Sequence, residues 1–256
     1  MAGMASLTEV IAALDDELAI ADFEDYAPNG LQVPGPSEVG TVVTGVSAQA
    51  ELFERAAKAG ADLVLVHHGL FWEGTPRRLD ATAKRRLKLL FDHDMALAAY
   101  HLPLDAHPRL GNNAIICERL GLVGPAPFGL HRGRPVGWAA RAPGEGLTIG
   151  ELVDRVAALT GRWPLVFDSG PERVRSLGVV SGGASSSLDE AIERGLDAFL
   201  TGEPAERVMG QARESGVHFI AAGHYATETF GVRALGELLS GRFGLRHQFA
   251  DVPNPI

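Results

Sequence analysis

Cysteine is almost absent from this sequence. The single one, Cys117, lies in the apolar stretch NNAIICERLG. One cysteine cannot form an intramolecular disulfide, so the chain suits a reducing compartment. Because its neighbours are apolar residues of an expected helix, we expect Cys117 to be a buried structural thiol.

Targeting and membrane-spanning segments are lacking as well. The N-terminal stretch has no basic region and soon reaches Asp15 and Asp16, which argues against a signal peptide. No apolar run reaches the roughly 18 residues that span a bilayer. Together with the cysteine count, these features predict a cytoplasmic protein that does not insert into membranes.

Basic residues are outnumbered. The 256 residues include 23 Lys and Arg against 32 Asp and Glu, which gives a formal net charge of −9. A general binder of nucleic acid or anionic membranes needs a basic surface, so neither partner is expected. A small anionic substrate in a locally positive pocket remains compatible with this charge. No G-x4-G-K-[ST] phosphate loop occurs, so such a ligand would need arginines, metals or loop amides.

Strand-like and helix-like segments alternate along the whole chain. This order is typical of an α/β fold with a parallel sheet. The stretch 124–137 is rich in glycine and proline and is the best candidate for a boundary. We therefore predict a first α/β lobe over 1–125 and a second over 126–256, whose C-terminal segments could cross over to the first.

The two halves resemble each other. Residues 42–69 align with 179–203 across a two-residue gap, and 95–105 align with 218–228. The second alignment pairs His101 and Asp105 with His224 and Glu228. Two unrelated βαβ units could converge on such a pattern, but the matched pairs favour an internal duplication. A duplication predicts two similar lobes with a site between them.

Histidines and carboxylates follow three of the expected strands. His67 and His68 end one strand, His101 and Asp105 follow the next, and His224 and Glu228 follow a strand of the second half. Ligands of parallel α/β folds gather at the carboxyl ends of strands. Two histidines alone could simply bond to loop carbonyls, but three strand ends of this kind favour a metal site.

The spacing of these residues favours two ions. Neighbouring strand residues point to opposite faces, so His67 and His68 reach one ion only if the chain turns there. Two ions, with one histidine each, remove this difficulty. His224 and Glu228 share one helix face at i and i+4. Asp105 or Glu228 could bridge two cations.

Five stretches together resemble one known family. They are YAPNGLQV (26–33), VLVHHGLFW (64–72), YHLPLDAHPRLGNN (100–113), TGE (201–203) and GHYATET (223–229). They are similar to the NIF-three-like dinuclear metal-centre family, whose members are named type 2 homologues of GTP cyclohydrolase I. The resemblance implies two related α/β lobes, a di-metal site in the cleft between them and a ring-shaped homohexamer. Longer members carry an inserted middle domain, which the short spacing here excludes.

The resemblance also implies roles for particular residues. The metal ligands fall on His67, His68, Asp105, His224 and Glu228, and they would hold two divalent ions. Nitrogen and oxygen ligands without sulfur fit Zn, Mn, Fe or Co. We expect Asn29 and Tyr100 to line the cleft. His101 and Glu203 are candidates for acid–base groups or for groups that orient the ligands.

These expectations predict a metal-dependent hydrolase. The family name implies a GTP cyclohydrolase-like activity, the opening of the guanine ring at C8, on a nucleotide or a related anionic substrate. A phosphoesterase of other specificity would use the same site. An alternative of a different class is a metal-binding or regulatory oligomer without turnover.

Overall fold

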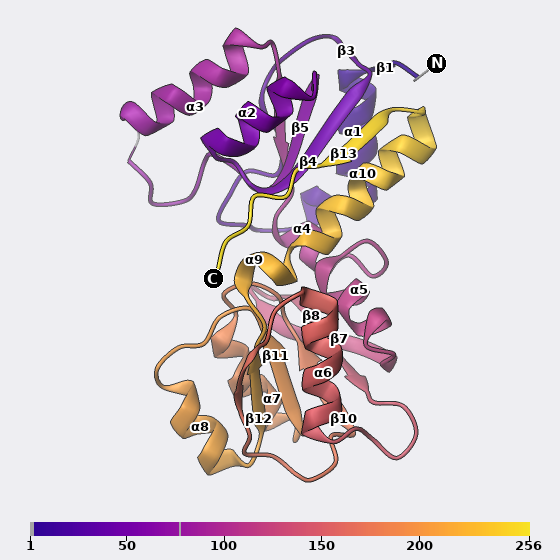
Figure 1. Cartoon of the computed structure of the whole chain (residues 1–256), viewed down its shortest axis with the longest axis vertical. Helices are drawn as coiled ribbons and strands as arrows, with labels where there is room; N and C mark the ends of the chain where they lie inside the picture. The colour runs from indigo at the N-terminus through magenta and orange to yellow at the C-terminus, as the bar shows by residue number, and fades with distance from the viewer. Residues whose placement is uncertain (1–2, 77) are drawn as a thin grey trace. The chain divides into compact units, whose positions relative to one another are not determined.

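Figure 1 shows the computed structural model, which describes residues 3–76 and 78–256. The chain forms two compact units. The first takes the described residues up to Leu104 together with Gly231–Val252, and the second takes Asp105–Phe230 together with Pro253–Ile256. Each is an α/β unit, so the predicted fold class is confirmed. The predicted division after residue 125, which rests on the Gly- and Pro-rich stretch 124–137, stays a prediction.

The first unit contains a five-stranded sheet. Its strand order is β13-β4-β5-β6-β2, in which only the edge strand β2 is antiparallel to its neighbour. The strands are β2 (Gly30–Val33), β4 (Thr41–Ser47), β5 (Leu63–His68), β6 (Ala96–Ala99) and β13 (Arg246–Phe249). A separate two-stranded pair joins β1 (Ala5–Ser6) to β3 (Glu38–Val39).

Helices accompany this sheet, and α2 and α3 lie next to each other (Figure 1). They are α1 (Leu7–Glu17), the 3-10 helix η1 (Ile20–Asp22), α2 (Ala50–Lys58), α3 (Ala81–Asp92), α4 (Leu102–Ala106) and α10 (Thr229–Phe243). Helix α4 runs past Leu104 into the second unit, and α10 belongs to the first unit from Gly231 onward. The central strands are apolar at most positions, as is usual where helices cover both faces of a parallel sheet. Leu63–Val66 of β5 are fully buried, and Phe53 of α2 packs into one core with Val64 and Val66.

The second unit contains a six-stranded sheet in the order β7-β8-β10-β11-β12-β9. The strands are β7 (Val123–His131), β8 (Arg134–Arg141), β9 (Leu165–Phe167), β10 (Ser176–Val179), β11 (Ala198–Thr201) and β12 (His218–Ala221). Strands β10, β11 and β12 are parallel, and the other pairings are antiparallel. The helices are α5 (Asn112–Arg119), α6 (Ile149–Thr160), η2 (Ser185–Ser187), α7 (Leu188–Glu193), α8 (Val208–Ser215) and α9 (His224–Thr227).

The two sheets share the topology of a four-strand core. Strands β4, β5 and β6 correspond to β10, β11 and β12, and the antiparallel edge strands β2 and β9 each precede their set in the sequence. Helices α2 and α7 occupy the same place in this order, as do α3 and α8. This shared order supports the internal duplication.

The strand register corrects the predicted alignment. Val42 pairs with Leu63 in the first unit, and Leu177 pairs with Ala198 in the second. Val42 therefore corresponds to Leu177, without a gap, and not to Val179. Both strands are apolar at consecutive positions, so hydrophobicity alone could not set the register.

Two aspartates confirm the corrected register. Asp62 accepts hydrogen bonds from the backbone N–H groups of Gly40 and Thr41, at the start of β4. Asp197 accepts from the backbone N–H groups of Arg175 and Ser176, at the start of β10. Each carboxylate thus fixes the start of the neighbouring strand in its own unit.

His101 and His224 do not occupy equivalent positions in the two units, because they are offset by one residue. Tyr100 N–H donates to the carbonyl of Val66, and Ala222 N–H donates to that of Thr201. Tyr100 thus corresponds to Ala222, and His224 stands one residue further along its strand end than His101. The additional residue is Gly223, whose φ of +99° is accessible to glycine and strained for other residues. The predicted pairing of His101 with His224 is therefore offset by one residue.

Cys117 lies in α5 and is buried, as predicted. Burial raises the pKa of its thiol to about 12, because the thiolate would lose its hydration. We expect the folded protein not to react with Ellman's reagent at pH 8 and to release one thiol equivalent in denaturant. Fast reaction of the folded protein would contradict the buried position. Among the described residues, no helix is long and apolar enough to cross a membrane.

Candidate metal centre

Three histidines of the first unit lie together at the carboxyl ends of β5 and β6. The ring centroids of His67 and His68 are 4.8 Å apart, and His101 lies 5.0 Å from the first and 5.7 Å from the second. One potential ligand nitrogen from each ring lies within 4.8 Å of the other two. The two consecutive histidines therefore reach one region, in spite of the alternation of a regular strand.

Each of these imidazoles is held through its Nδ1 atom. His67 Nδ1 lies 2.9 Å from the carbonyl oxygen of Tyr100, and His68 Nδ1 lies 3.1 Å from Ser47 Oγ. His101 Nδ1 lies 2.8 Å from Asp25 Oδ1. A carbonyl or a carboxylate only accepts, so His67 and His101 carry a proton on Nδ1. In the neutral rings Nε2 then has the lone pair that a metal requires.

Asp25 is a site residue that the sequence did not reveal. Its carboxylate also accepts hydrogen bonds from Leu102 N–H at 2.9 Å and Asn29 Nδ2 at 3.0 Å, and its side chain is only 2% exposed. Burial raises the pKa of this carboxyl, but the hydrogen bond and charge of His101 and the other donors outweigh it and lower the pKa to about 2. Asp25 is therefore ionised at neutral pH.

Asn29 and Tyr100 hold the histidines in place through hydrogen bonds. Asn29 donates to Asp25, and its Oδ1 accepts from the backbone N–H of His101 at 2.8 Å. The Tyr100 side chain is fully buried and donates its hydroxyl proton to Asp15 at 2.7 Å. Burial, together with Asp15, raises the pKa of this phenol above its ordinary value. It is the backbone carbonyl of Tyr100 that reaches His67.

A second group of donors forms within the second unit. His224 Nδ1 bonds to Glu203, and His224 Nε2 lies 3.1 Å from Glu228 Oε1. Burial lowers the pKa of His224, but the two carboxylates outweigh it and raise the pKa to about 9. Glu203 thus holds the ring through Nδ1, as Asp25 holds His101. Glu228 faces the nitrogen that would bind a metal.

Two glycines make room for this second group. A Cβ on Gly182 would collide with the Glu228 carboxylate. A Cβ on Gly202 would lie 2.6 Å from the Cα of His224 and 2.7 Å from the carbonyl oxygen of Gly182. Neither position tolerates a side chain without a shift of the residues around it. Gly202 belongs to the TGE motif, and this close approach of the backbone to His224 explains why the motif has a glycine there.

Asp105 has its own set of partners in the second unit. The carboxylate is buried, and its Oδ1 accepts from Asn112 Nδ2 at 2.8 Å and from Ser181 Oγ at 3.1 Å. Asn113 joins the same network, because its Oδ1 accepts from Ser181 N–H at 2.7 Å. The asparagines belong to the quoted motif RLGNN, but Ser181 lies in no motif and only the fold reveals it.

The comparisons with known proteins identify the family. The model of Duf34/NIF3 (NGG1p interacting factor 3) matches residues 5–255. This chain belongs to the Duf34/NIF3 family. The predicted resemblance is thereby confirmed.

Relatives and solved structures agree with this membership. Proteins named "GTP cyclohydrolase 1 type 2 homolog" are 43% identical in Pseudomonas aeruginosa and 44% identical in Escherichia coli K12, over 98% and 97% of this chain and 98% of each relative. The solved structure described as protein ybgI, of unknown function, has a TM-score of 0.93 at 42% identity. It covers 98% of this chain and 100% of its own. TTHA1606 from Thermus thermophilus has a TM-score of 0.91 at 39% identity with the same coverage.

The donor sets of this Duf34/NIF3 chain fit divalent metal ions. They consist of imidazole nitrogens and carboxylate oxygens, which suit Zn, Mn, Fe or Co. The partners behind the rings also fit, because metal-binding histidines usually donate their other N–H to a carboxylate or a carbonyl. In the first unit, His67, His68 and His101 are positioned to hold a metal ion. In the second unit, His224 lies within ion-pair distance of Glu228 and Glu203.

The family motif YAPNGLQV anchors the loop that follows the two histidines. Gln32 Oε1 accepts from Leu70 N–H at 2.8 Å, and the Tyr26 carbonyl accepts from Glu73 N–H at 2.6 Å. The anchored loop brings the Trp72 ring to 5.6 Å from His68 and 5.1 Å from His101. Trp72 therefore packs beside the imidazoles.

Proposed function

We propose that this Duf34/NIF3 protein is a metal-dependent hydrolase with a dinuclear centre. Its ligands in this proposal are His67, His68, Asp105, His224 and Glu228. The observation that supports it most is the set of Nδ1 partners, which orient the imidazoles and leave Nε2 for a metal. Two divalent ions, Zn, Mn, Fe or Co, would supply an acidified water and positive charge for an anionic substrate.

The remaining polar residues take supporting roles in the proposal. His101 accepts and returns a proton at Nε2, since Asp25 holds its Nδ1 proton and stabilises the charged ring. Glu203 orients His224 through Nδ1, so we assign it a positioning role. Asn29 keeps Asp25 and the backbone of His101 together.

The proposed substrate is a nucleotide or a related anion. The curated relatives are named GTP cyclohydrolase 1 type 2 homologues, which makes GTP the first candidate. A phosphoesterase of other specificity would use the same residues. We also propose that the chain works in the cytoplasm as a homo-oligomer, a homohexamer by the family resemblance.

The experiment is a screen of the Mn, Zn, Fe and Co forms with GTP, other nucleotides and generic phosphoesters. We expect at least one metal form to turn over one of these substrates, and the metal-free protein to turn over none. If fully loaded protein were inactive on all of them, the hydrolase proposal would be wrong. A metal-binding or regulatory oligomer would then be the better description.

Asp25→Asn tests the assigned role of His101. The amide keeps an oxygen near Nδ1 but removes the charge, so turnover should fall about 10- to 100-fold. The metal content should remain that of the unchanged protein. Asp22→Asn, at an exposed position in η1, is the matched control and should change neither.

Nitrogen-15 NMR of the metal-free protein gives a second readout for Asp25. His101 should carry its proton on Nδ1 in the unchanged protein and should lose this preference in Asp25→Ala. A merely structural carboxylate would not set the tautomer of one ring. Unchanged turnover in Asp25→Asn together with an unchanged tautomer in Asp25→Ala would refute the role of Asp25.

A further inference from the structure

A cavity of about 770 Å³ lies within the first unit, and one of its lining residues, Trp72, packs beside the histidine cluster. The loop after β5 and one face of α3 line it. Its main lining residues are Phe71, Trp72, Arg78, Leu79, Arg86 and Leu87. Because Trp72 packs against His68 and His101, the wall of the cavity continues to the candidate metal centre.

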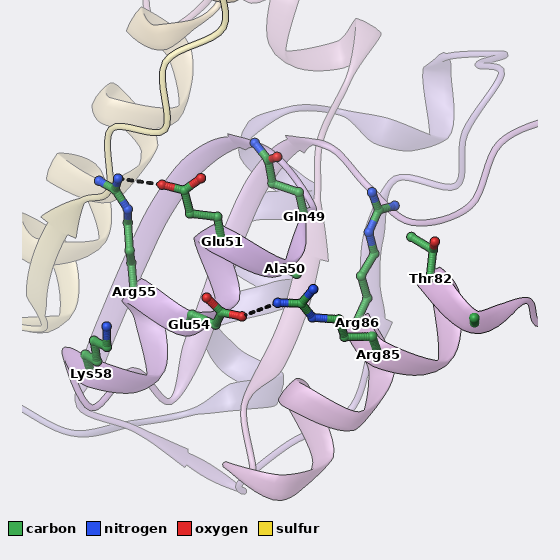
Figure 2. A pocket seen from close by; sticks show the side chains of 10 residues that line it. Gln49, Ala50, Glu51, Glu54, Arg55, Lys58, Thr82, Arg85 and Arg86 are labelled. Carbon is green, nitrogen blue, oxygen red and sulfur yellow. Dashed lines mark hydrogen bonds and ion pairs between the residues drawn. The ribbon is translucent and has the colours of Figure 1, made fainter.

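A neighbouring hollow serves as a contrast. It lies between α2 and α3, has a volume of about 790 Å³ and is shown in Figure 2. Ion pairs join Arg55 to Glu51 at 2.6 Å and Arg85 to Glu54 at 2.7 Å across its surface. These two pairs neutralise their own charges, whereas Arg86, which lines both this hollow and the cavity, takes part in neither pair.

Arg86 differs from these paired arginines. In Figure 2 its side chain points away from the Glu54–Arg85 pair. Its Nε atom is buried and has no hydrogen-bond partner among the residues that the structure describes. A buried donor without an acceptor is costly, and Arg86 has no ion pair among the described residues, so its guanidinium charge is available to an anion in the cavity. Guanidinium groups bind phosphate and carboxylate oxygens especially well.

The carboxylates nearby do not take this role. Asp80 and Glu73 also line the cavity. Asp80 Oδ1 accepts from Ala83 N–H at 2.7 Å and so caps the start of α3. Glu73 lies in the anchored loop, next to Trp72 in sequence, so an anion would avoid that side. The favourable place for negative charge is therefore beside Arg86.

The loop side of the cavity is apolar and aromatic. Phe71 is 42% exposed and Leu79 is 68% exposed, although both are large hydrophobic residues. Trp72 lies between this surface and the histidines. Aromatic side chains in such a position stack against planar rings such as nucleobases, with little dependence on which base is bound.

We propose that this cavity binds a planar aromatic ring that carries an anionic group, as a nucleotide does. The ring stacks on Phe71 and Trp72, and the anionic group bonds to Arg86. This inference rests on the proposed function, because it explains how a nucleotide substrate would be held beside the metal centre. The binding itself requires no metal.

Calorimetry on the metal-free, full-length protein tests the proposal with guanosine monophosphate, guanosine and inorganic phosphate as probes. The nucleotide should bind more tightly than either part. Arg86→Ala should lower the affinity for the nucleotide about tenfold and leave that for guanosine unchanged. Phe71→Ala should lower both affinities. Arg85→Ala removes the same charge one residue earlier and should change neither.

Equal losses in Arg85→Ala and Arg86→Ala would indicate unspecific attraction and overturn the proposal. So would undetectable binding of the nucleotide, or guanosine binding that ignores Phe71→Ala. Circular dichroism checks that each variant is folded, and Arg86→Gln replaces Arg86→Ala if the latter is not. Because the metal-free protein is used, these results are independent of whether the loaded protein has hydrolase activity.

Discussion

His67→Ala and Glu228→Ala are each expected to abolish binding of at least one metal ion. Protein loaded with Zn or Mn should hold about two ions per chain, and each variant should hold about one or none. The reason is that each substitution removes a ligand from a set in which the other groups are already oriented for a metal. Elemental analysis after removal of unbound ions measures the content directly.

Two exposed residues provide matched controls for these variants. His93→Ala removes an imidazole at the end of α3, and Glu214→Ala removes a carboxylate from α8. Both should keep the full metal content. A wild-type content below one ion per chain would refute the dinuclear centre, and full retention in both ligand variants would show that the ligands are misassigned.

Phe53→Ala is expected to lower the free energy of unfolding of the first unit strongly. Phe53 is fully buried in the core beside β4 and β5, and removal of such a ring costs about 3–5 kcal/mol. Urea denaturation followed by circular dichroism gives the free energy of unfolding. Phe91→Ala is the control, because Phe91 is 63% exposed on α3 and should change stability by about 0.5 kcal/mol or less. A loss below about 1 kcal/mol for Phe53→Ala would contradict its place in the core.

The sequence predicted the α/β class and the strand ends well. The apolar run before His67 fits a strand of a parallel sheet, because such a strand is covered on both faces and needs consecutive apolar residues. Strands of a parallel sheet also end at a common edge, so the residues that follow them could be grouped without coordinates. Within each unit the structure brings those residues close together.

The register and the supporting residues required the structure. Apolar strands align equally well at several offsets, which is why Val42 was matched to Val179 and not to Leu177. Asp25 stands beside Glu24 in an irregular segment, and no periodicity separates the two carboxylates. Its importance comes from a hydrogen bond to His101, 76 positions away in the sequence. Ser181 reaches Asp105 across the same separation.

Strand β13 has a consequence for how the protein is made. It pairs with β4 and completes one edge of the first sheet, although nearly all the second unit lies between them in the sequence. Domains generally fold as units while the ribosome releases the chain, the N-terminal one first. Here the ribosome releases the second unit up to Phe230 before strand β13 (Arg246–Phe249) can pair with the sheet of the first unit. Until then the edge of β4 is open to pairing with other strands, so the nascent first unit is the one that needs protection from aggregation.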